Sequence, residues 1–284
     1  MTNRCGKIGI ITCLLVLSAC SSTTFVYNRL DIVLPWYLDD YVELDNEQEQ
    51  QLDNLLQPFL AWHRQEELPQ YVALLDRIES SLGQQLTGDD IAAIYEDIQA
   101  GWLRLEAKSL DWLLTMGASL SDRQVTDMMA HLEEQQQDYE KEYLGRSERK
   151  YRKETDDRLL DSMQDYLGRL DKSQRNRLRE ATANLQRSDH VWLEERAAWL
   201  ERLTLIMRRE PGWQQQIRDA IANRDETTAQ AYQETFWHNM EIIFSAIADV
   251  LNSRNAKQDK RLRNELNDLR DDLQTLIAQG VAAG

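Results

Sequence analysis

The stretch Leu120-Ser121-Asp122-Arg123-Gln124 has the form of a helix start, and stretches of this form decide how the chain folds. Ser121 can accept a hydrogen bond from the backbone amide three residues on, and the Gln124 side chain can reach back to Ser121, as in a capping box. Leu120 can pack against Val125 in the first helical turn. We therefore predict that a helix begins here.

Three further starts of this form occur in the chain. They are Leu44-Asp45-Asn46-Glu47-Gln48, Leu86-Thr87-Gly88-Asp89-Asp90 and Leu170-Asp171-Lys172-Ser173-Gln174. The starts divide the chain into long helices, which we expect at about residues 45–82, 87–118, 121–168, 171–209 and 211–253, before a helical tail. The starts keep no fixed period, so the sequence does not predict a solenoid.

The composition is typical of helices throughout. Glycine and proline number only 11 and 4 among 284 residues, while Ala, Leu, Glu, Gln, Arg and Asp dominate. No apolar run alternates as a strand does. No linker rich in Gly, Pro or Ser interrupts residues 44–279. The sequence predicts an all-α fold, an elongated bundle of long helices, with a single helical domain over residues 44–284.

Three positions weaken the predicted helices, and one leucine series strengthens the last. Pro58 and Pro69 should each kink or interrupt their helix, because proline lacks an amide donor and clashes with the preceding turn. Gly145 is a weak point in the helix over 121–168. The tail carries a seam of leucines spaced four and three apart. They are Leu262, Leu266, Leu269, Leu273 and Leu276. We expect this seam to pack within the chain, with a partner helix as the alternative.

The N-terminus has the features of a secretory signal peptide. Arg4 and Lys7 precede an apolar run over residues 8–17, which at about ten residues is too short to span a bilayer. Leu17-Ser18-Ala19-Cys20 follows and resembles the lipobox of bacterial lipoproteins, in which a diacylglycerol alkylates the cysteine and the new amino terminus is acylated. We expect residues 1–19 to be removed and Cys20 to carry the lipid. The alternative is an ordinary cleaved signal with an incidental cysteine.

The mature chain is strongly acidic. Loss of Arg4 and Lys7 with the signal peptide changes the formal net charge from −16 to −18. This charge argues against binding to nucleic acid and against broad contact with anionic lipid. Cys5 and Cys13 also leave with the signal, so the mature chain has no intrachain disulfide and depends on packing for its stability.

Residues 20–43 form the lipidated N-terminus and an aromatic-rich juxtamembrane segment. Four polar residues, 21–24, separate Cys20 from the apolar residues between Phe25 and Tyr41, so these begin close to the bilayer. They either lie at the headgroup level or cover the base of the helical core. In many bacteria Asp directly after the lipidated cysteine retains a lipoprotein in the inner membrane. Ser21 therefore predicts the periplasmic side of the outer membrane.

One stretch combines the residue types of a binding site. The stretch from Trp62 to Tyr71 places an aromatic residue, a histidine, an arginine and carboxylates beside Pro69. On a helix His63 and Glu67 face the same way. The candidate binding residues are Trp62, His63, Arg64, Glu67 and Tyr71. The alternative is a kinked helix held by local ion pairs.

A basic island interrupts the acidic chain. It comprises Arg146, Arg149, Lys150, Arg152 and Lys153. We expect a solvated stretch that is balanced by neighbouring carboxylates, with contact to lipid headgroups or to an acidic partner as the alternative.

Motifs of catalysis do not occur in the sequence. It contains no glycine-rich phosphate loop, no Gly-x-Ser-x-Gly and no His-Glu-x-x-His. Its four histidines lie on different predicted helices without the spacing of metal ligands. No pair of carboxylates stands out from the many present. We therefore expect no catalytic residue, no metal site and no cofactor.

Several stretches resemble a family of proteobacterial lipoproteins of unknown function. They are Cys20-Ser21-Ser22, residues 25–31, residues 35–42, and Trp62-His63-Arg64 with Glu66-Glu67-Leu68-Pro69. The resemblance runs to roughly residue 210 and implies a helical lipoprotein without supplying an activity. The starts at Leu44, Leu120 and Leu170 also resemble the Leu-Thr-x-x-Gln repeats of periplasmic chaperones of the Spy and CpxP type, with Asp or Ser in place of Thr.

These observations favour a non-catalytic function. We expect a lipid-anchored, periplasm-facing protein that binds another protein or an envelope component. A chaperone-like envelope stress protein is the second hypothesis, and an enzyme acting on a cell-wall or lipid substrate is the third. An exposed apolar concave face would favour the second, and a deep pocket with convergent polar groups the third.

Overall fold

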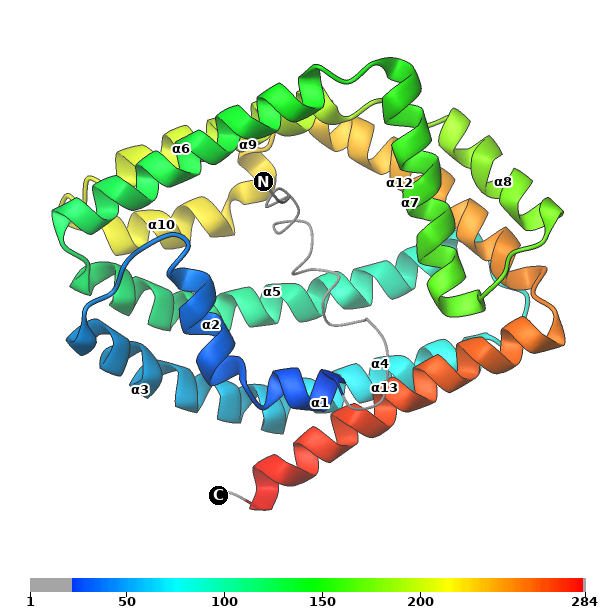
Figure 1. The fold of residues 1–284 in the computed structure, drawn as a ribbon, viewed down its shortest axis with the longest axis horizontal. Helices are drawn as coiled ribbons and strands as arrows, with labels where there is room; N and C mark the ends of the chain where they lie inside the picture. Colours follow the sequence, from blue (N-terminus) through cyan, green and yellow to red (C-terminus); the bar gives the residue numbers. More distant parts are fainter. Residues whose placement is uncertain (1–21, 283–284) are drawn as a thin grey trace, which may run out of the picture.

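A computed structural model describes residues 22–282 and confirms the all-α fold, because this part of the chain contains helices and no strand (Figure 1). The predicted signal peptide and Cys20 lie outside the described residues. Within the described range no helix combines the length and the apolar character needed to cross a bilayer.

The helices follow one another with short connections. In chain order they are α1 (Ser22–Tyr27), α2 (Leu30–Leu38), α3 (Asn46–Trp62), the π-helical turn η1 (His63–Glu67), α4 (Leu68–Ser81), α5 (Gly88–Ser119), α6 (Asp122–Leu144), α7 (Glu148–Leu167), α8 (Lys172–Ala183), α9 (Asp189–Ile206), α10 (Trp213–Ala222), α11 (Arg224–Thr227), α12 (Gln230–Asn252) and α13 (Ala256–Ala282).

All four predicted helix starts are confirmed as capping boxes. Asp45, Thr87, Ser121 and Asp171 each accept a hydrogen bond from the third helical amide, and the side chain at that third position bonds back to the cap. Of the preceding leucines, Leu86, Leu120 and Leu170 are buried and Leu44 is half-buried, and Leu86 lies in the same apolar cluster as Ile91. The starts therefore form as local interactions dictate.

The glutamines of these boxes also join helix starts in pairs. Gln48 and Gln124 exchange amide hydrogen bonds of 3.1 and 2.7 Å, which hold the starts of α3 and α6 together. Each amide also donates to a backbone carbonyl just before the other box. Gln48 reaches Ser119 at 2.9 Å, and Gln124 reaches Glu43 at 2.7 Å.

A second pair repeats this geometry at the starts of α8 and α13. Gln174 and Gln258 exchange amide bonds of 3.1 and 2.9 Å, and Gln258 also donates to the Arg169 carbonyl at 3.1 Å. The box at α13 uses Asn255 as the cap, which accepts from the Gln258 amide. The sequence analysis missed this start, because an arginine rather than a leucine precedes the cap.

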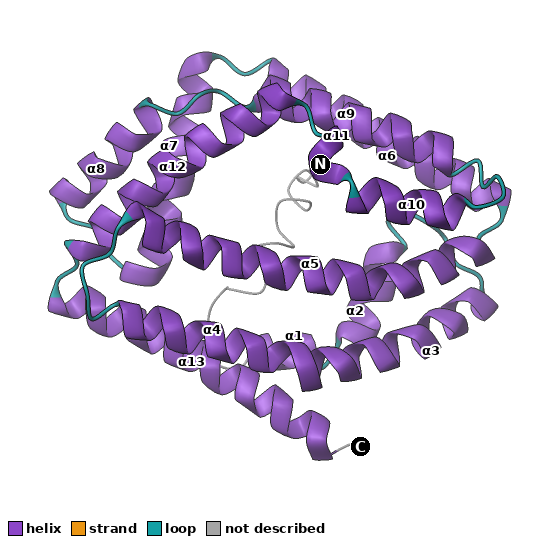
Figure 2. Cartoon of the chain, turned by 180° about the vertical axis from the view of Figure 1, so that it is seen from behind, coloured by secondary structure: helices purple, strands orange, loops and turns teal. Residues whose placement is uncertain are grey.

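The two pairs organise two three-helix units that pack reciprocally. In the first unit α3, η1 and α4 follow one another and count as one helix, and α5 and α6 are the other two. In the second unit α8 and α9 together take the first place, and α12 and α13 are the other two. Here α6 packs on α9, α13 packs on α4, and α5 packs on α12, as seen from both sides in Figures 1 and 2. The recurring starts therefore mark an approximate internal two-fold arrangement.

Some predicted helix boundaries are wrong. The helix expected over 121–168 breaks after Leu144, so the weak point at Gly145 separates α6 from α7. The helix expected over 171–209 divides into α8 and α9, because the Asn239 side chain bonds both the amide and the carbonyl of Gln186 at 2.8 Å and satisfies the backbone outside a helix. The region 211–253 divides into α10, α11 and α12.

The proline and leucine predictions have different outcomes. Pro58 lies inside α3 and does not interrupt it, whereas Pro69 stands at the first turn of α4, directly after η1. The packing of the tail seam within the chain is confirmed. Leu262, Leu266, Leu273 and Leu276 are buried in the main apolar cluster, and α13 packs along α4 and α7.

Candidate functional site

The candidate stretch contains the π-helical turn η1, in which the Leu68 amide bonds the His63 carbonyl across five residues. Pro69 follows and has no amide to donate, so a regular α-helix would lose a hydrogen bond at this position. Turns of this type interrupt α-helices frequently at functional sites. Here the wider turn directs two titratable side chains, His63 and Glu67, into the interior, where each is less than 10% exposed: His63 at 6% and Glu67 at 2%.

His63 is bound to the N-terminal helix. Its Nδ1 lies 2.7 Å from the hydroxyl of Tyr27 in α1, and its ring lies 5.8 Å from the ring of Tyr71. Burial lowers the pKa of His63 to about 4, and burial raises the pKa of Tyr27 to about 12. Both side chains are therefore uncharged at neutral pH.

Glu67 is bound to α5. Its two carboxylate oxygens accept a forked pair of hydrogen bonds from Arg104, at 2.9 Å from Nε and 2.6 Å from Nη2. The bond to Glu67 raises the pKa of Arg104, and burial, together with the carboxylate of Glu67, raises the pKa of Tyr71 to about 12. Such paired, hydrogen-bonded geometry is what allows a carboxylate to be buried.

A glycine allows this close approach. A Cβ atom at Gly101 of α5 would lie 3.2 Å from Cε1 of Tyr71 and 3.6 Å from Oε1 of Glu67. Glycine in a helix interior costs about 1 kcal/mol relative to alanine, so its presence in a long helix indicates a packing requirement. Gly101 thus sets the distance between α5 and η1.

An open cleft of about 720 Å³ lies between η1 with α4 and the facing side of α5. Trp62, Gln65, Glu66 and Gln70 lie on one side of it, and Arg104 and Lys108 on the other. The Lys108 ammonium lies 5.4 Å from the centre of the Trp62 ring. The cleft therefore presents an aromatic ring, amides, the Glu66 carboxylate and cations, beside the ion pair between the buried Glu67 and the half-exposed Arg104.

Four of the five candidate residues divide between two sides of η1, and the fifth, Tyr71 of α4, lies against the His63 ring. Trp62 and Glu67 line the cleft, while His63 packs behind it against Tyr27. Arg64 turns towards α1, where it donates to Asn28 Oδ1 at 2.8 Å. The structure thus brings the candidates together around one turn, and their role in binding remains a prediction.

Sequence reasoning missed three residues of this site. Tyr27, Arg104 and Lys108 come from α1 and α5, far from the candidate stretch along the chain. The one local signal was Gly101 in the middle of a strongly helical segment, three residues before Arg104.

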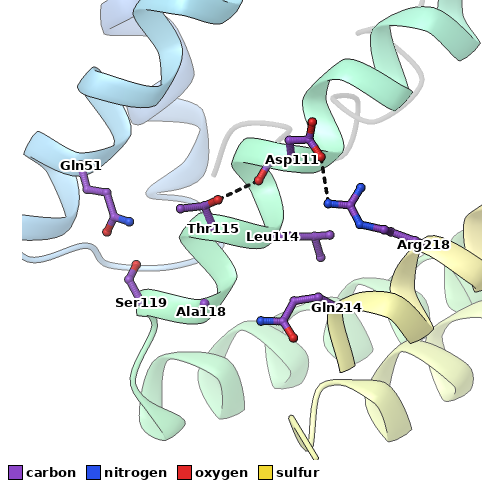
Figure 3. A pocket seen from close by; sticks show the side chains of 8 residues that line it. All are labelled: Gln51, Asp111, Leu114, Thr115, Ala118, Ser119, Gln214 and Arg218. Atoms are coloured by element: carbon purple, nitrogen blue, oxygen red, sulfur yellow. Dashed lines mark hydrogen bonds and ion pairs between the residues drawn. The ribbon is translucent and has the colours of Figure 1, made fainter. Parts of the chain in front are cut away.

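A second cleft, of about 530 Å³, is less suited to a functional role (Figure 3). It lies between α5 and α10, where Arg218 pairs with Asp111 at 2.8 Å. The side chains of Arg218 and Asp111 are 41% and 71% exposed, so this is a surface ion pair of little energetic weight. No three His, Cys, Asp or Glu side chains in the described part of the chain are grouped to hold a metal ion.

The basic island is balanced by carboxylates as expected, with one exception. Arg152 pairs with Glu148, and Lys153 with Asp157. Arg146, which we expected to be solvated, is instead buried with only 8% of its side chain exposed. It bridges Glu154 at 2.6 Å and Asp189 at 2.5 Å, because the break before α9 brings Asp189 against it.

Comparison with known proteins gives one match. The model of a family of unknown function, DUF6279, matches residues 40–233, which include the cleft, the first three-helix unit, and α8 and α9 of the second. No curated protein and no solved structure matches the chain.

Proposed function

The chain belongs to the DUF6279 family of unknown function, and from its own residues we propose that it is a lipid-anchored, non-catalytic binding protein of the bacterial envelope. Cys20 holds it on the periplasm-facing side of the outer membrane. The cleft beside η1 binds a segment of a partner protein.

The observation that supports binding is the composition of the cleft. Trp62 and Arg104 belong to the three residue types, Trp, Tyr and Arg, that most often dominate binding energy at protein interfaces. Gln65 and Gln70 supply amides for a polypeptide backbone. Arg104 is 45% exposed on its side chain and is held in place by the buried Glu67. A fixed guanidinium and a neighbouring aromatic ring suit recognition with little loss of conformational freedom.

The same geometry disfavours acid–base catalysis at this turn. A general base must reach a proton of the substrate. His63 does not line the cleft and faces Tyr27, and both oxygens of Glu67 are occupied by Arg104. His63 and Glu67 therefore have a structural role: they hold η1 against α1 and fix Arg104 at the side of the cleft.

A chaperone-like function is the second candidate. It is favoured by exposed apolar side chains on the packed pair α5 and α12, where Ile98 and Trp237 are 51% and 49% exposed. If the protein suppresses the aggregation of unfolded clients, and if Ile98→Asp and Trp237→Asp abolish this effect, the chaperone-like function would be favoured over binding of a partner in the cleft.

Site-specific photocrosslinking in cells tests the proposed function. A photoreactive phenylalanine analogue replaces Gln70 in the cleft, and a matched variant carries it at Gln216, an exposed glutamine of α10. We expect a discrete protein adduct from position 70 only, and its loss when Arg104→Met is added. Equal adducts from both positions would contradict the proposal.

A further inference from the structure

We propose that the outer face of α1 and α2 is a lipid-docking surface that lies in the headgroup region of the membrane. Its residues are Phe25, Val26, Ile32, Val33 and Trp36. The position of this surface at the membrane rests on the proposed lipid anchor, but its affinity for lipid does not.

The first step is exposure. Phe25, Ile32 and Trp36 are 64%, 56% and 60% exposed, and Val26 and Val33 are 49% and 37% exposed. Within α2 the spacing of Ile32, Val33 and Trp36 places them on one side of the helix. The juxtamembrane segment predicted from the sequence therefore divides, since Tyr27 packs into the core while these five side chains face outward.

The second step is that the surface is rigidly held. Leu34 and Leu38 on the other side of α2 pack against the buried Leu52 and Leu56 of α3. In α1, the Thr24 hydroxyl donates to Asp272 at 3.1 Å and the Asn28 amide donates to Gln279 at 3.0 Å, both in α13. The apolar side chains are thus presented by fixed helices.

The third step identifies the occupant. Four residues separate Cys20 from Phe25, so a lipid on Cys20 holds the surface within about 17 Å of the bilayer. Tryptophan is favoured at the headgroup level, where apolar side chains enter the acyl boundary. The Arg29 guanidinium lies 5.7 Å from the centre of the Phe25 ring and is exposed, placed to meet a lipid phosphate. Because the mature chain has a formal net charge of −18 after loss of Arg4 and Lys7, the preferred lipids are zwitterionic.

Docking would also orient the cleft. Tyr27 follows Phe25 and Val26 and bonds His63 at the start of η1. The helix that touches lipid therefore contacts the turn that shapes the cleft, and it fixes the direction in which the cleft faces the periplasm.

Vesicle binding tests the proposal on the mature chain with Cys20→Ser, which has no lipid and no cysteine. We expect it to float with phosphatidylcholine vesicles. Ile32→Asp with Trp36→Asp should lower the partition coefficient at least about tenfold. The control, Leu205→Asp with Trp237→Asp, replaces side chains of 52% and 49% exposure elsewhere and should leave it within about twofold. Circular dichroism verifies that each variant is folded.

A second readout locates the contact. An environment-sensitive dye on Ile32→Cys should shift to the blue and brighten with vesicles, while the same dye on Leu205→Cys should not. Absence of flotation, equal losses in both variant pairs, or a dye response to protein concentration without vesicles would overturn the proposal, the last by indicating a second copy as the occupant. Failure of the anchor is a separate result, read from fractionation of the lipidated protein.

Discussion

His63 shows how one side chain couples the N-terminal helix to the cleft. Its imidazole is buried, and its partner is the hydroxyl of Tyr27 rather than a carboxylate. Burial disfavours the charged ring, which is why its pKa falls to about 4 instead of rising. The local structure therefore depends on a neutral histidine.

The first prediction concerns pH. The unfolded chain binds a proton at His63 near pH 6.5 and the folded chain only near pH 4. The free energy of unfolding should therefore fall as the pH drops from 6.5 to about 4, by about 3 kcal/mol from this group. Urea denaturation across this range measures the loss. A His63→Phe variant should lack this part of it, and an equal loss in both proteins would contradict the prediction.

The second prediction concerns the Glu67–Arg104 pair. Arg104→Met removes the ion-pair partner of Glu67, whose carboxylate is only 2% exposed. This change should lower the free energy of unfolding by about 3 kcal/mol, which is the lower end of the cost of breaking a buried pair, because Arg104 is half exposed. Glu67→Gln in the Arg104→Met background should recover part of this loss. Denaturation midpoints of the four proteins form a double-mutant cycle. Purely additive losses would show that the two side chains act independently.

At the scale of elements, a few adjacent residues decide where a helix starts, whereas residues distant in the chain decide where a helix is interrupted. Capping boxes are local, so four of them could be predicted from the sequence. The break at residues 184–188 depends on Asn239 of α12, and the π-helical turn depends on packing against α1 and α5. For the same reason the sequence supplied Trp62, His63 and Glu67 of the candidate site but not Tyr27 or Arg104.

The third prediction compares two residues of one capping box. Ser121→Ala should lower the free energy of unfolding by about 0.5–2 kcal/mol, the usual cost of a lost N-cap. Gln124→Ala should cost more, because Gln124 also bonds Gln48 and the Glu43 carbonyl. Chemical denaturation ranks the two, with Gln216→Ala as an exposed control. A Gln124→Ala loss no larger than that of Ser121→Ala would mean that the amide pair adds nothing.

At the scale of the whole molecule, two units hold each other through α6 on α9 and α13 on α4. The periodicity of apolar residues predicted the helices but not the packing of each unit on the other, because a leucine seam does not specify which helix it packs against. The proposed lipid anchor belongs to the same scale, because it would determine where the whole molecule lies.

The fourth prediction concerns that anchor. Cys20→Ser should abolish lipidation and move the protein from the membrane to the soluble fraction, apart from the weaker binding that the α1–α2 surface supplies. Ser21→Asp should move the lipidated protein from the outer to the inner membrane on a density gradient. Firm sedimentation of Cys20→Ser with membranes at high salt, after disruption of the α1–α2 surface by Ile32→Asp and Trp36→Asp, would refute the lipobox assignment.

The contact between α1 and α13 has a consequence for the order of events during folding. Thr24 and Asn28 bond to residues 248 and 251 positions later in the chain, near its end. Contacts of such long sequence separation form late. Docking of α1 on α13 therefore waits until α13 has been made, although the Tyr27–His63 bond joins residues only 36 positions apart. A chain cut short before α13 would leave Thr24 and Asn28 of α1 without these hydrogen-bond partners.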